Sequence, residues 1–191
     1  PEGYVLVGSD MSSLEDRTKQ HWMFPHDPEY VEEMTTDDFD PHLDLAVAAG
    51  ALTKDQSARH KSGEEKFSEI RHTYKQANYS CVYGAGGATV ARAAGISERE
   101  GNQLVEAYWK RNWSVKNIAE DCVVKVFRKQ KWLYNPVSRL WYSLRAEKDR
   151  FSTLNQGTGV WCFDTWVKYQ RQKGLPQVAQ FHDETINIVK E

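Results

Sequence analysis

Apolar and polar positions follow two patterns along this chain, which predict strands near its ends and helices between them. The β-rich run from Tyr4 to Ser9 predicts a short buried strand that ends at Asp10. Near the other end, 177–181 and 185–189 predict two more strands, joined through His182-Asp183-Glu184. The pattern therefore places an acidic residue at the end of the first strand and two more at a hairpin tip.

The stretch from Arg71 to Gly84 is helical in pattern, and its polar side has a distinctive order. Arg71, Lys75, Tyr79 and Tyr83 follow at steps of four, which stacks them on one stripe of a helix without an acidic residue among them. Two cations followed by two phenol rings match a nucleoside triphosphate, a polyanion with a flat ring attached. A solvated amphipathic helix is the alternative for this stretch taken alone.

Other helices are expected before and after this stretch. Their predicted ranges are 43–52, 88–94, a helix opened by the capping box of Ser97 and Glu100, 115–129 and 145–169. Gly157 and Gly159 lie inside the last of them, where each glycine costs about 1 kcal/mol relative to alanine. We expect another backbone to approach closely at these two positions.

A mixture of basic and aromatic residues follows the middle helices. Lys131-Trp132-Leu133 and Leu140-Trp141-Tyr142 flank Asn135-Pro136, a pattern that predicts a hairpin. Two interpretations are equally favoured, nucleic-acid contact and a solvated face over a packed core. The residues concerned are Lys125, Arg128, Lys129 and Lys131 beside Phe127, Trp132 and Tyr134.

Charge is distributed unevenly over the 191 residues, a length that suggests one domain or one domain with a lobe. The net charge is −2, but residues 1–60 carry −9, residues 61–131 carry +5 and the remainder +2. A basic middle is suited to phosphate contact. The three cysteines form no CxxC pair, which fits a reducing compartment. No apolar run approaches the ~20 residues of a membrane span, so no membrane partner is expected.

The acidic residues at the strand ends are candidates for metal binding. Asp10 is held by a rigid element, and a divalent cation would relieve the repulsion between Asp183 and Glu184. Turn residues are the alternative for each of these positions considered separately. A further acidic cluster around Asp37 and Asp40 lacks the glycine and the final glutamate of a calcium loop, which favours helix caps in a solvated loop.

Three blocks, taken in order, resemble the motifs of family A DNA polymerases, the bacterial repair and phage replicative type. Asp10-x-Ser12-x-x-Glu15-x-Arg17 resembles motif A, Arg71 to Gly84 motif B, and His182-Asp183-Glu184 motif C. Asp40-x-His42 also looks like the Asp-x-His of this family. The resemblance covers nearly the whole chain.

The resemblance implies a two-metal-ion catalytic site. Asp10 and Asp183 would hold two Mg²⁺ ions, and Glu184 would be a supporting acid. Lys75 and Arg71 would bind the triphosphate, with Lys75 the proton donor to pyrophosphate. The expected reaction is the addition of deoxynucleoside monophosphates to a primer 3′-hydroxyl with release of pyrophosphate, in DNA replication or repair.

The same resemblance assigns the remaining site residues. His42 would assist in binding the triphosphate, and Tyr79 stands where the family has Phe or Tyr. Tyr83 would lie against the incoming base or the template, and Glu15 would block a ribose 2′-hydroxyl. The implied DNA contacts are Gln156 in the minor groove and His182 near the primer end.

The fold implied by the resemblance is α+β, with an antiparallel-sheet palm and a mainly helical fingers subdomain, an incomplete polymerase right hand. Residues 1–16 and 147–191 would form a discontinuous, partial palm, and 17–146 the fingers. The chain opens with Pro1, so we expect a piece of a longer protein. Expected partners are primer-template DNA, deoxynucleoside triphosphates and the remainder of the polymerase chain, with its thumb and an exonuclease domain, in bacterial or phage-infected cytoplasm.

Three positions depart from the family pattern. Ser152 stands in place of the usual Asn, Lys148 in place of Arg, and Asp16 in place of an apolar residue. The first two weaken the implied primer-template contacts near Gln156, nothing explains Asp16, and the departures prompt the hypothesis of a phage origin. Two other functions stay open, a single-subunit RNA polymerase, which Glu15 disfavours, and a non-catalytic nucleic-acid-binding remnant.

Overall fold

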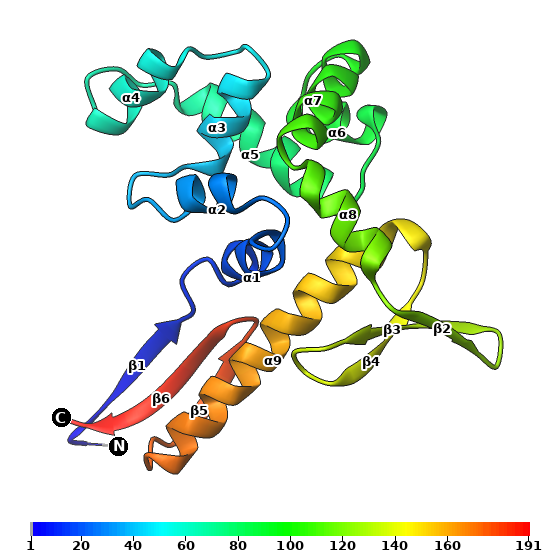
Figure 1. Ribbon diagram of the computed structural model, residues 1–191. Coiled ribbons are helices and arrows are strands. Elements are labelled where there is room, and N and C mark those ends of the chain that lie inside the picture. The colour runs from blue at the N-terminus through cyan, green and yellow to red at the C-terminus, as the bar shows by residue number, and fades with distance from the viewer. Residues whose placement is uncertain (1) are drawn as a thin grey trace. The chain divides into compact units, whose positions relative to one another are not determined.

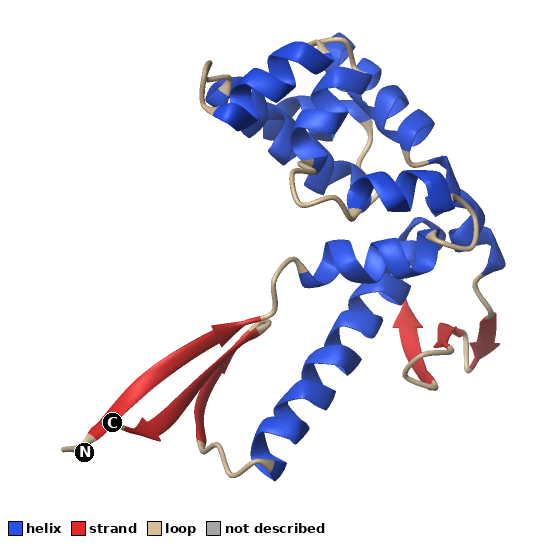
Figure 2. Cartoon of the chain, turned by 60° about the vertical axis from the view of Figure 1, so that its left-hand side comes forward, coloured by secondary structure: helices blue, strands red, loops and turns tan. Residues whose placement is uncertain are grey.

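The computed structural model describes residues 2–191, which form two compact units (Figure 1). One, the mixed unit, comprises the chain up to Trp22, Cys122–Arg145 and Thr153–Glu191; the other, the helical unit, comprises Met23–Asp121 and Ala146–Ser152. All the strands of residues 2–191 belong to the mixed unit, as the colours of Figure 2 show. The predicted α+β fold class is confirmed. The palm and fingers ranges follow other bounds and stay predictions.

The two ends of the chain pair in the terminal sheet of the mixed unit. Its antiparallel strands, in the order β1-β6-β5, are β1 (Tyr4–Asp10), β6 (Glu184–Lys190) and β5 (Gln177–Phe181). Tyr4 lies opposite Lys190, and Asp10 opposite Glu184. The strands predicted at both ends are present, as expected of β-branched and aromatic side chains. The prediction that the first strand is buried is wrong, because β1 is an edge strand of a three-stranded sheet and Tyr4, Val5, Leu6 and Val7 are between 40% and 67% exposed.

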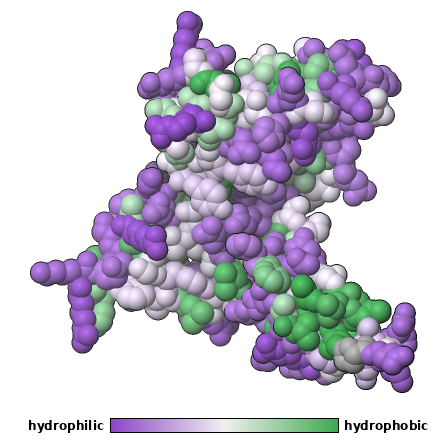
Figure 3. Space-filling model, turned by 180° about the vertical axis from the view of Figure 1, so that it is seen from behind, coloured by the Kyte–Doolittle hydropathy of each residue, from purple (hydrophilic) through white to green (hydrophobic). Residues whose placement is uncertain are grey.

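The two faces of the terminal sheet differ in burial. Thr185 and Asn187 of β6 are buried, and Gln170 of α9 (Arg150–Gln172) donates a hydrogen bond from Nε2 to Thr185 Oγ1 at 3.2 Å. On the opposite face Leu6 and Phe181 are largely exposed. Figure 3 shows a continuous hydrophobic area over this sheet. An apolar area of this kind is usually covered by another surface.

A second antiparallel sheet, the hairpin sheet, packs on α9. Its strands are β2 (Val124–Phe127), β3 (Gln130–Asn135) and β4 (Leu140–Leu144), in that order. The fully buried Asn135 donates from Nδ2 to the Leu154 carbonyl at 3.1 Å and to Thr158 Oγ1 at 2.9 Å. Tyr142 donates from its hydroxyl to the Gly157 carbonyl at 3.1 Å. These polar contacts attach the predicted hairpin to one face of the long helix.

Several helices of the helical unit begin directly after a polar capping residue, and two of them have a proline at their first position. Asp27 caps α2 (Pro28–Met34), Asp40 caps α3 (Pro41–Ala48), Thr53 caps α4 (Lys54–Ser62) and Ser97 caps α7 (Glu98–Arg111). The capping box expected at Ser97 and Glu100 is confirmed. The other elements are α5 (Ser68–Val82), α6 (Gly87–Ala94), α8 (Trp113–Asp121) and the short 3₁₀ helix Glu147–Asp149. No helix within residues 2–191 is both long and apolar enough to cross a bilayer.

The core of the helical unit forms where α3, α5, α6 and α7 meet. Leu45, Ala77, Cys81, Val90 and Tyr108 are among its buried side chains. Small residues permit the close approach of α6 and α7, since a Cβ on Gly101 would lie 2.3 Å from the Gly87 carbonyl oxygen. A side chain at Gly101 would therefore force the two helices apart.

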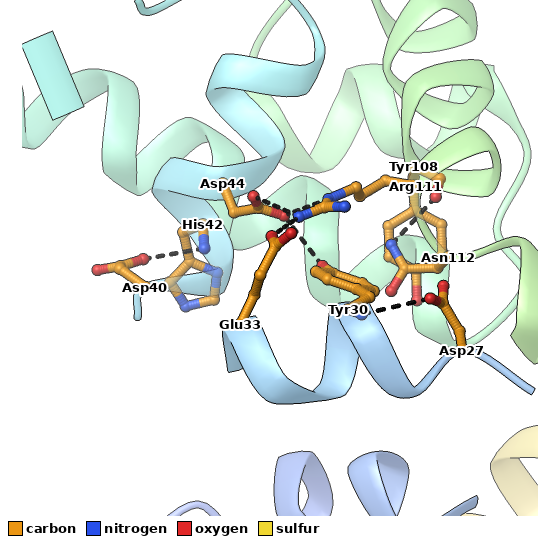
Figure 4. A network of polar contacts seen from close by, with 9 residues as sticks. All are labelled: Asp27, Tyr30, Glu33, Asp40, His42, Asp44, Tyr108, Arg111 and Asn112. Carbon is orange, nitrogen blue, oxygen red and sulfur yellow. Dashed lines mark hydrogen bonds and ion pairs between the residues drawn. The ribbon is translucent and has the colours of Figure 1, made fainter. Parts of the chain in front are cut away.

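A polar clamp holds α2, α3 and α7 together (Figure 4). Arg111 of α7 contacts Asp44 of α3 from Nε at 3.1 Å and from Nη2 at 3.3 Å, and its Nη2 also reaches Glu33 of α2. The guanidinium carbon lies 3.8 Å from the ring centroid of Tyr30, whose hydroxyl donates to Asp44 at 2.9 Å. Burial and the nearby Asp44 carboxylate raise the pKa of Tyr30. The flat guanidinium thus serves as both ion and stacking partner.

Two expectations about helices are wrong. The predicted helix 115–129 ends at Asp121, and Val124–Phe127 forms β2 instead, because its β-branched residues pair with β3. The glycines of α9 do not face another backbone. A Cβ on Gly157 would lie 2.9 Å from two ring carbons of Tyr142, while a Cβ on Gly159 would meet Leu14 at an ordinary 3.5 Å.

Gly157→Ala should therefore destabilise the protein, and Gly159→Ala should not. The first change pushes a methyl group into the Tyr142 ring and should lower the free energy of unfolding by about 2 kcal/mol. The second change should leave stability unchanged or raise it by up to about 1 kcal/mol, since alanine favours a helix. Urea unfolding of the two variants measures both values. Equal effects of the two substitutions would contradict the packing described for Gly157.

Candidate active site

Three acidic residues lie at one end of the terminal sheet. Asp10, the last residue of β1, lies opposite Glu184, the first residue of β6. The Met11 amide donates to the Asp183 carbonyl at 3.1 Å, so Asp183 lies beside the end of β1. A two-residue turn, with His182 at φ +50°, reverses the chain between β5 and β6. The sheet thus brings the predicted residues Asp10, His182, Asp183 and Glu184 to the same end of its strands.

The register also decides on which face two of these carboxylates lie. Directly opposed residues of antiparallel strands share a face, so Asp10 and Glu184 point to the same side of the sheet. Gly8 is on that side too, and a Cβ there would lie 2.8 Å from Glu184 Oε1. The glycine therefore leaves room for the Glu184 carboxylate to lie over β1 at Gly8, two residues before Asp10.

The donor set suits magnesium bound together with phosphates. Among the residues that the structure describes, no three His, Cys, Asp or Glu side chains form a ready metal-binding group. Mg²⁺ is usually held by only one or two carboxylates, with substrate phosphates and water completing its shell. Asp10, at the end of β1, and Asp183, in the turn before β6, supply hard oxygen ligands of this kind. The two residues therefore fit this ion.

Glu15 and Gln156 lie on neighbouring helices of the mixed unit. Glu15 is exposed in the first turn of α1 (Leu14–Met23), and Gln156 is exposed on α9. Between them, the buried Asn155 donates from Nδ2 to the Glu15 carbonyl at 3.0 Å. Asn155 therefore fixes the turn that carries Glu15, a role that sequence reasoning missed. An asparagine inside a helical pattern, where its propensity is poor, was the available signal.

The stripe predicted on the central helix is present in α5. Ala77 and Cys81 are fully buried, while the rings of Tyr79 and Tyr83 are 47% and 41% exposed. Lys75 Nζ lies 5.9 Å from the ring centroid of Tyr79. The helix ends at Val82, and Tyr83 forms its C-cap. Cationic and aromatic groups are thus displayed together, although their roles in nucleotide binding stay predictions.

Arg71, the first cation of the stripe, has an acidic partner on another helix, which the sequence pattern did not reveal. Its Nε donates to Asp40 Oδ2 at 2.6 Å. The other oxygen of Asp40 accepts hydrogen bonds from the His42 and Leu43 amides at 2.9 and 3.1 Å. One carboxylate thus caps α3 and fixes the guanidinium of α5. Arg71 is held in place before any ligand arrives.

His42 is nearly buried between α3 and α5. Its ring lies 5.7 Å from the Tyr79 ring, and its Nδ1 is 3.3 Å from Asn78 Nδ2. The predicted residues His42, Arg71 and Tyr79 are therefore brought together within the helical unit. The carboxylates of Asp10 and Asp183 belong to the mixed unit.

Comparison with known proteins supports the fold. The chain matches no protein-family model and no curated protein sequence. It is similar over its whole length to a solved structure, the POL domain of Pol1 from M. smegmatis in complex with DNA primer-template and dNTP, with a TM-score of 0.70 and 21% identity. The chain spans 35% of the length of that structure. The likeness at this identity establishes the fold, which is that of a fragment of a DNA polymerase domain.

The Asp40 contacts predict a pH-dependent contribution to stability. Burial alone would raise the pKa of the Asp40 carboxyl, but hydrogen bonds from Arg71 and from the Leu43 and His42 amides hold it below its ordinary 3.8. The folded state then binds fewer protons than the unfolded state. The contribution is therefore complete above the ordinary pKa and is lost as the pH falls through the folded-state pKa.

Asp40→Asn should lower the free energy of unfolding by about 2 kcal/mol at neutral pH, because it removes an ionic hydrogen-bond acceptor and weakens a helix cap. The difference from the unmodified protein should shrink as the pH falls below about 4. Urea unfolding between neutral pH and about pH 3 measures this difference. Asp37→Asn, in the exposed loop just before Asp40, is the matched control and should change little. A difference that does not vary with pH would contradict the assignment.

Proposed function

We propose that this chain is the palm-and-fingers part of a family A DNA polymerase, which adds deoxynucleoside monophosphates to a primer 3′-hydroxyl. The observation that carries the proposal is the β1–β6 register, which sets Asp10 beside Asp183 and Glu184 in a fold similar to a polymerase domain. The order of the three motifs along the chain supports the same assignment. The solved neighbour was captured with DNA primer-template and dNTP, which makes these the first partners to test.

In the proposed mechanism, Asp10 and Asp183 would hold two Mg²⁺ ions at the end of the terminal sheet. Bound there, magnesium would lower the pKa of the primer 3′-hydroxyl and relieve charge on the triphosphate. Glu184 adds negative charge at the same end of the sheet, and His182 contacts the primer end. Gln156, exposed on α9 of the same unit, contacts the minor groove of the primer-template duplex.

The nucleotide is bound by the stripe of α5. Arg71 and Lys75 contact the triphosphate, and Lys75 donates a proton to the departing pyrophosphate. His42 assists them, while Tyr79 and Tyr83 lie along the sugar and base. The Asp40 contact keeps Arg71 in one rotamer, so less side-chain entropy is lost when the phosphates bind. Glu15 excludes a ribose by its bulk and charge.

The proposal concerns one part of a larger activity. The matched region is 35% of the solved polymerase chain, and the remainder of such a chain would provide the thumb that grips the duplex. Activity is therefore to be measured in the full natural protein that carries this sequence. An accompanying exonuclease domain is compatible with the proposal and is not required by it.

Asp183→Ala should abolish primer extension while leaving the fold intact. Asp183 is one of the two proposed magnesium ligands, and its loss should remove about 4 kcal/mol of transition-state stabilisation, so the rate should fall by a factor on the order of 1,000. A gel-based primer-extension assay with Mg²⁺ and the four dNTPs measures the rate. Asp164→Ala, at an exposed position of α9, is the control and should retain activity. Equal extension by Asp183→Ala and the unmodified protein would remove catalysis from this site.

Glu15→Ala should relax discrimination against ribonucleotides. Without the side chain that meets the 2′-hydroxyl, the ratio of ribonucleotide to deoxyribonucleotide incorporation should rise about tenfold or more, equivalent to about 1.4 kcal/mol. Single-nucleotide incorporation kinetics provide this ratio, and Asp16→Ala is the neighbouring control. An unchanged ratio would count against the family assignment. Efficient ribonucleotide use by the unmodified protein would favour an RNA polymerase instead.

A further inference from the structure

The hairpin sheet lies in the most basic segment of the chain. Cys122–Arg145 includes six basic residues and no acidic residue, in a protein whose net charge is −2. Such a segment attracts polyanions, because no carboxylate of its own neutralises the field. The basic residues are Lys125, Arg128, Lys129, Lys131, Arg139 and Arg145.

The strand register sorts the side chains of this sheet into two faces. One face is packed, with Leu133, Asn135 and Leu144 buried and Tyr142 bonded to α9. Pairing of Lys125 with Trp132 and of Tyr134 with Trp141 assigns these four residues to the opposite, outer face. Phe127, paired with Gln130, belongs to the outer face as well. Four aromatic rings therefore share one side of three short strands.

These rings lie close to one another and to cations. The centroids of Tyr134 and Trp141 are 5.1 Å apart, and Lys125 Nζ lies 5.1 Å from the centroid of Trp141. At the turn, the Arg128 guanidinium is 5.2 Å from the Phe127 ring. Phe127 is 62% exposed and Trp141 39% exposed, so both rings are accessible from solvent. Rings that only filled a core would be covered.

The β2–β3 turn holds two cations in an unfavourable backbone conformation. Arg128 and Lys129 have φ values of +49° and +65°, the left-handed region that a two-residue hairpin turn requires at both positions. Asn-Gly is the usual solution, and a long side chain in this region costs about 1 kcal/mol or more. Two positive charges are thus present at the tip of the hairpin where a more stable sequence was possible.

We propose that the outer face of the hairpin sheet is a stacking surface for single-stranded DNA. Bases that are not paired can stack on Phe127, Trp132, Tyr134 and Trp141, and the phosphates can lie along Lys125, Arg128 and Lys129. A duplex hides the flat faces of its bases and cannot use the rings. The choice of DNA over RNA rests on the proposed polymerase function, in which the template beyond the primer is single-stranded.

The alternative is a packed aromatic cluster whose cations are only solvated. Substitutions at Trp141 separate the two interpretations. Trp141→Phe keeps a ring, whereas Trp141→Leu keeps an apolar side chain without a ring. Stacking on one base is worth about 1–3 kcal/mol, so the leucine variant should bind single-stranded DNA about tenfold more weakly or worse. The phenylalanine variant should recover most of the affinity.

Binding is to be measured by fluorescence anisotropy with a labelled oligothymidine of about 20 nucleotides, which spans more than one stacking site. The full natural protein is used, without Mg²⁺ and without nucleotides, so that no catalysis occurs. A duplex of equal length and an oligouridine are the competing probes. Trp141→Leu should weaken the binding of oligothymidine most, the binding of oligouridine less, and the binding of the duplex least.

The double substitution Arg128→Asn/Lys129→Gly tests the turn. It removes two phosphate contacts, so the slope of log affinity against log salt should decrease by about 1.4 for a single strand. The same variant should have a melting temperature higher by about 3 °C, because Asn-Gly relieves the backbone strain. Lys168→Gln/Lys173→Gln is the matched control. It removes one charge from α9 and one from the residue just after it, Lys173, whose Nζ lies 5.3 Å from the exposed Tyr169 ring, and it should alter neither quantity.

Several results would overturn the inference. Equal affinities of Trp141→Leu and Trp141→Phe would show that no ring stacks on a base. Tighter binding of the duplex or of oligouridine would exclude single-stranded DNA as the partner. Equal salt slopes for the turn variant and for Lys168→Gln/Lys173→Gln would show that DNA affinity depends on total charge and not on the two cations of the β2–β3 turn. Primer extension does not enter these measurements, so an inactive protein that still lost affinity on Trp141→Leu would refute the proposed function alone.

Discussion

The antiparallel pairing of β1 with β6 is the constraint on which the candidate site depends. It joins segments from opposite ends of the chain and sets Asp10 opposite Glu184. Side chains alternate between faces with a period of two, so a slip of one residue would send Asp10 to the other side of the sheet. Burial of Thr185 and Asn187 on one face, with exposed Leu6 on the other, holds the register. The short turn at His182 then leaves Asp183 no freedom to move away from β1.

In the helical unit, α3 has the corresponding role. It carries two aspartates one turn apart, and each fixes an arginine of a different helix. Asp40 holds Arg71 of α5, and Asp44 holds Arg111 of α7. Charged hydrogen bonds of this geometry are stronger and more directional than contacts between neutral groups. The short helix α3 therefore sets the position of the α5 stripe, while its own apolar side packs in the core.

Local patterns were sufficient for some of these features and insufficient for others. The β-rich run from Tyr4 to Ser9 and the spacing of four between Arg71 and Tyr83 are local, and both elements are present. The Arg71–Asp40 contact joins residues 31 positions apart, and no period in the sequence encodes it. The helix predicted through Val124 was wrong, because β2 is stabilised by a partner strand and not by its own sequence. Gly157 was correctly expected to mark a close approach, but the approaching group is the Tyr142 ring.

The contacts of Asn135 link the hairpin sheet to the rest of the candidate site. This buried amide bonds to Leu154 and Thr158 of α9, the residues on either side of Gln156 along the helix. Asn155, next to them, bonds to the turn that carries Glu15. Little more than one turn of a single helix therefore fixes the hairpin sheet, Gln156 and Glu15 relative to each other within a single unit. A nucleic-acid strand that stacks on the hairpin sheet would be held at a defined distance from Gln156, because rigid elements position ligands better than loops. The buried polar residues of α9 are thus explained by positioning, since an apolar helix would pack equally well without them.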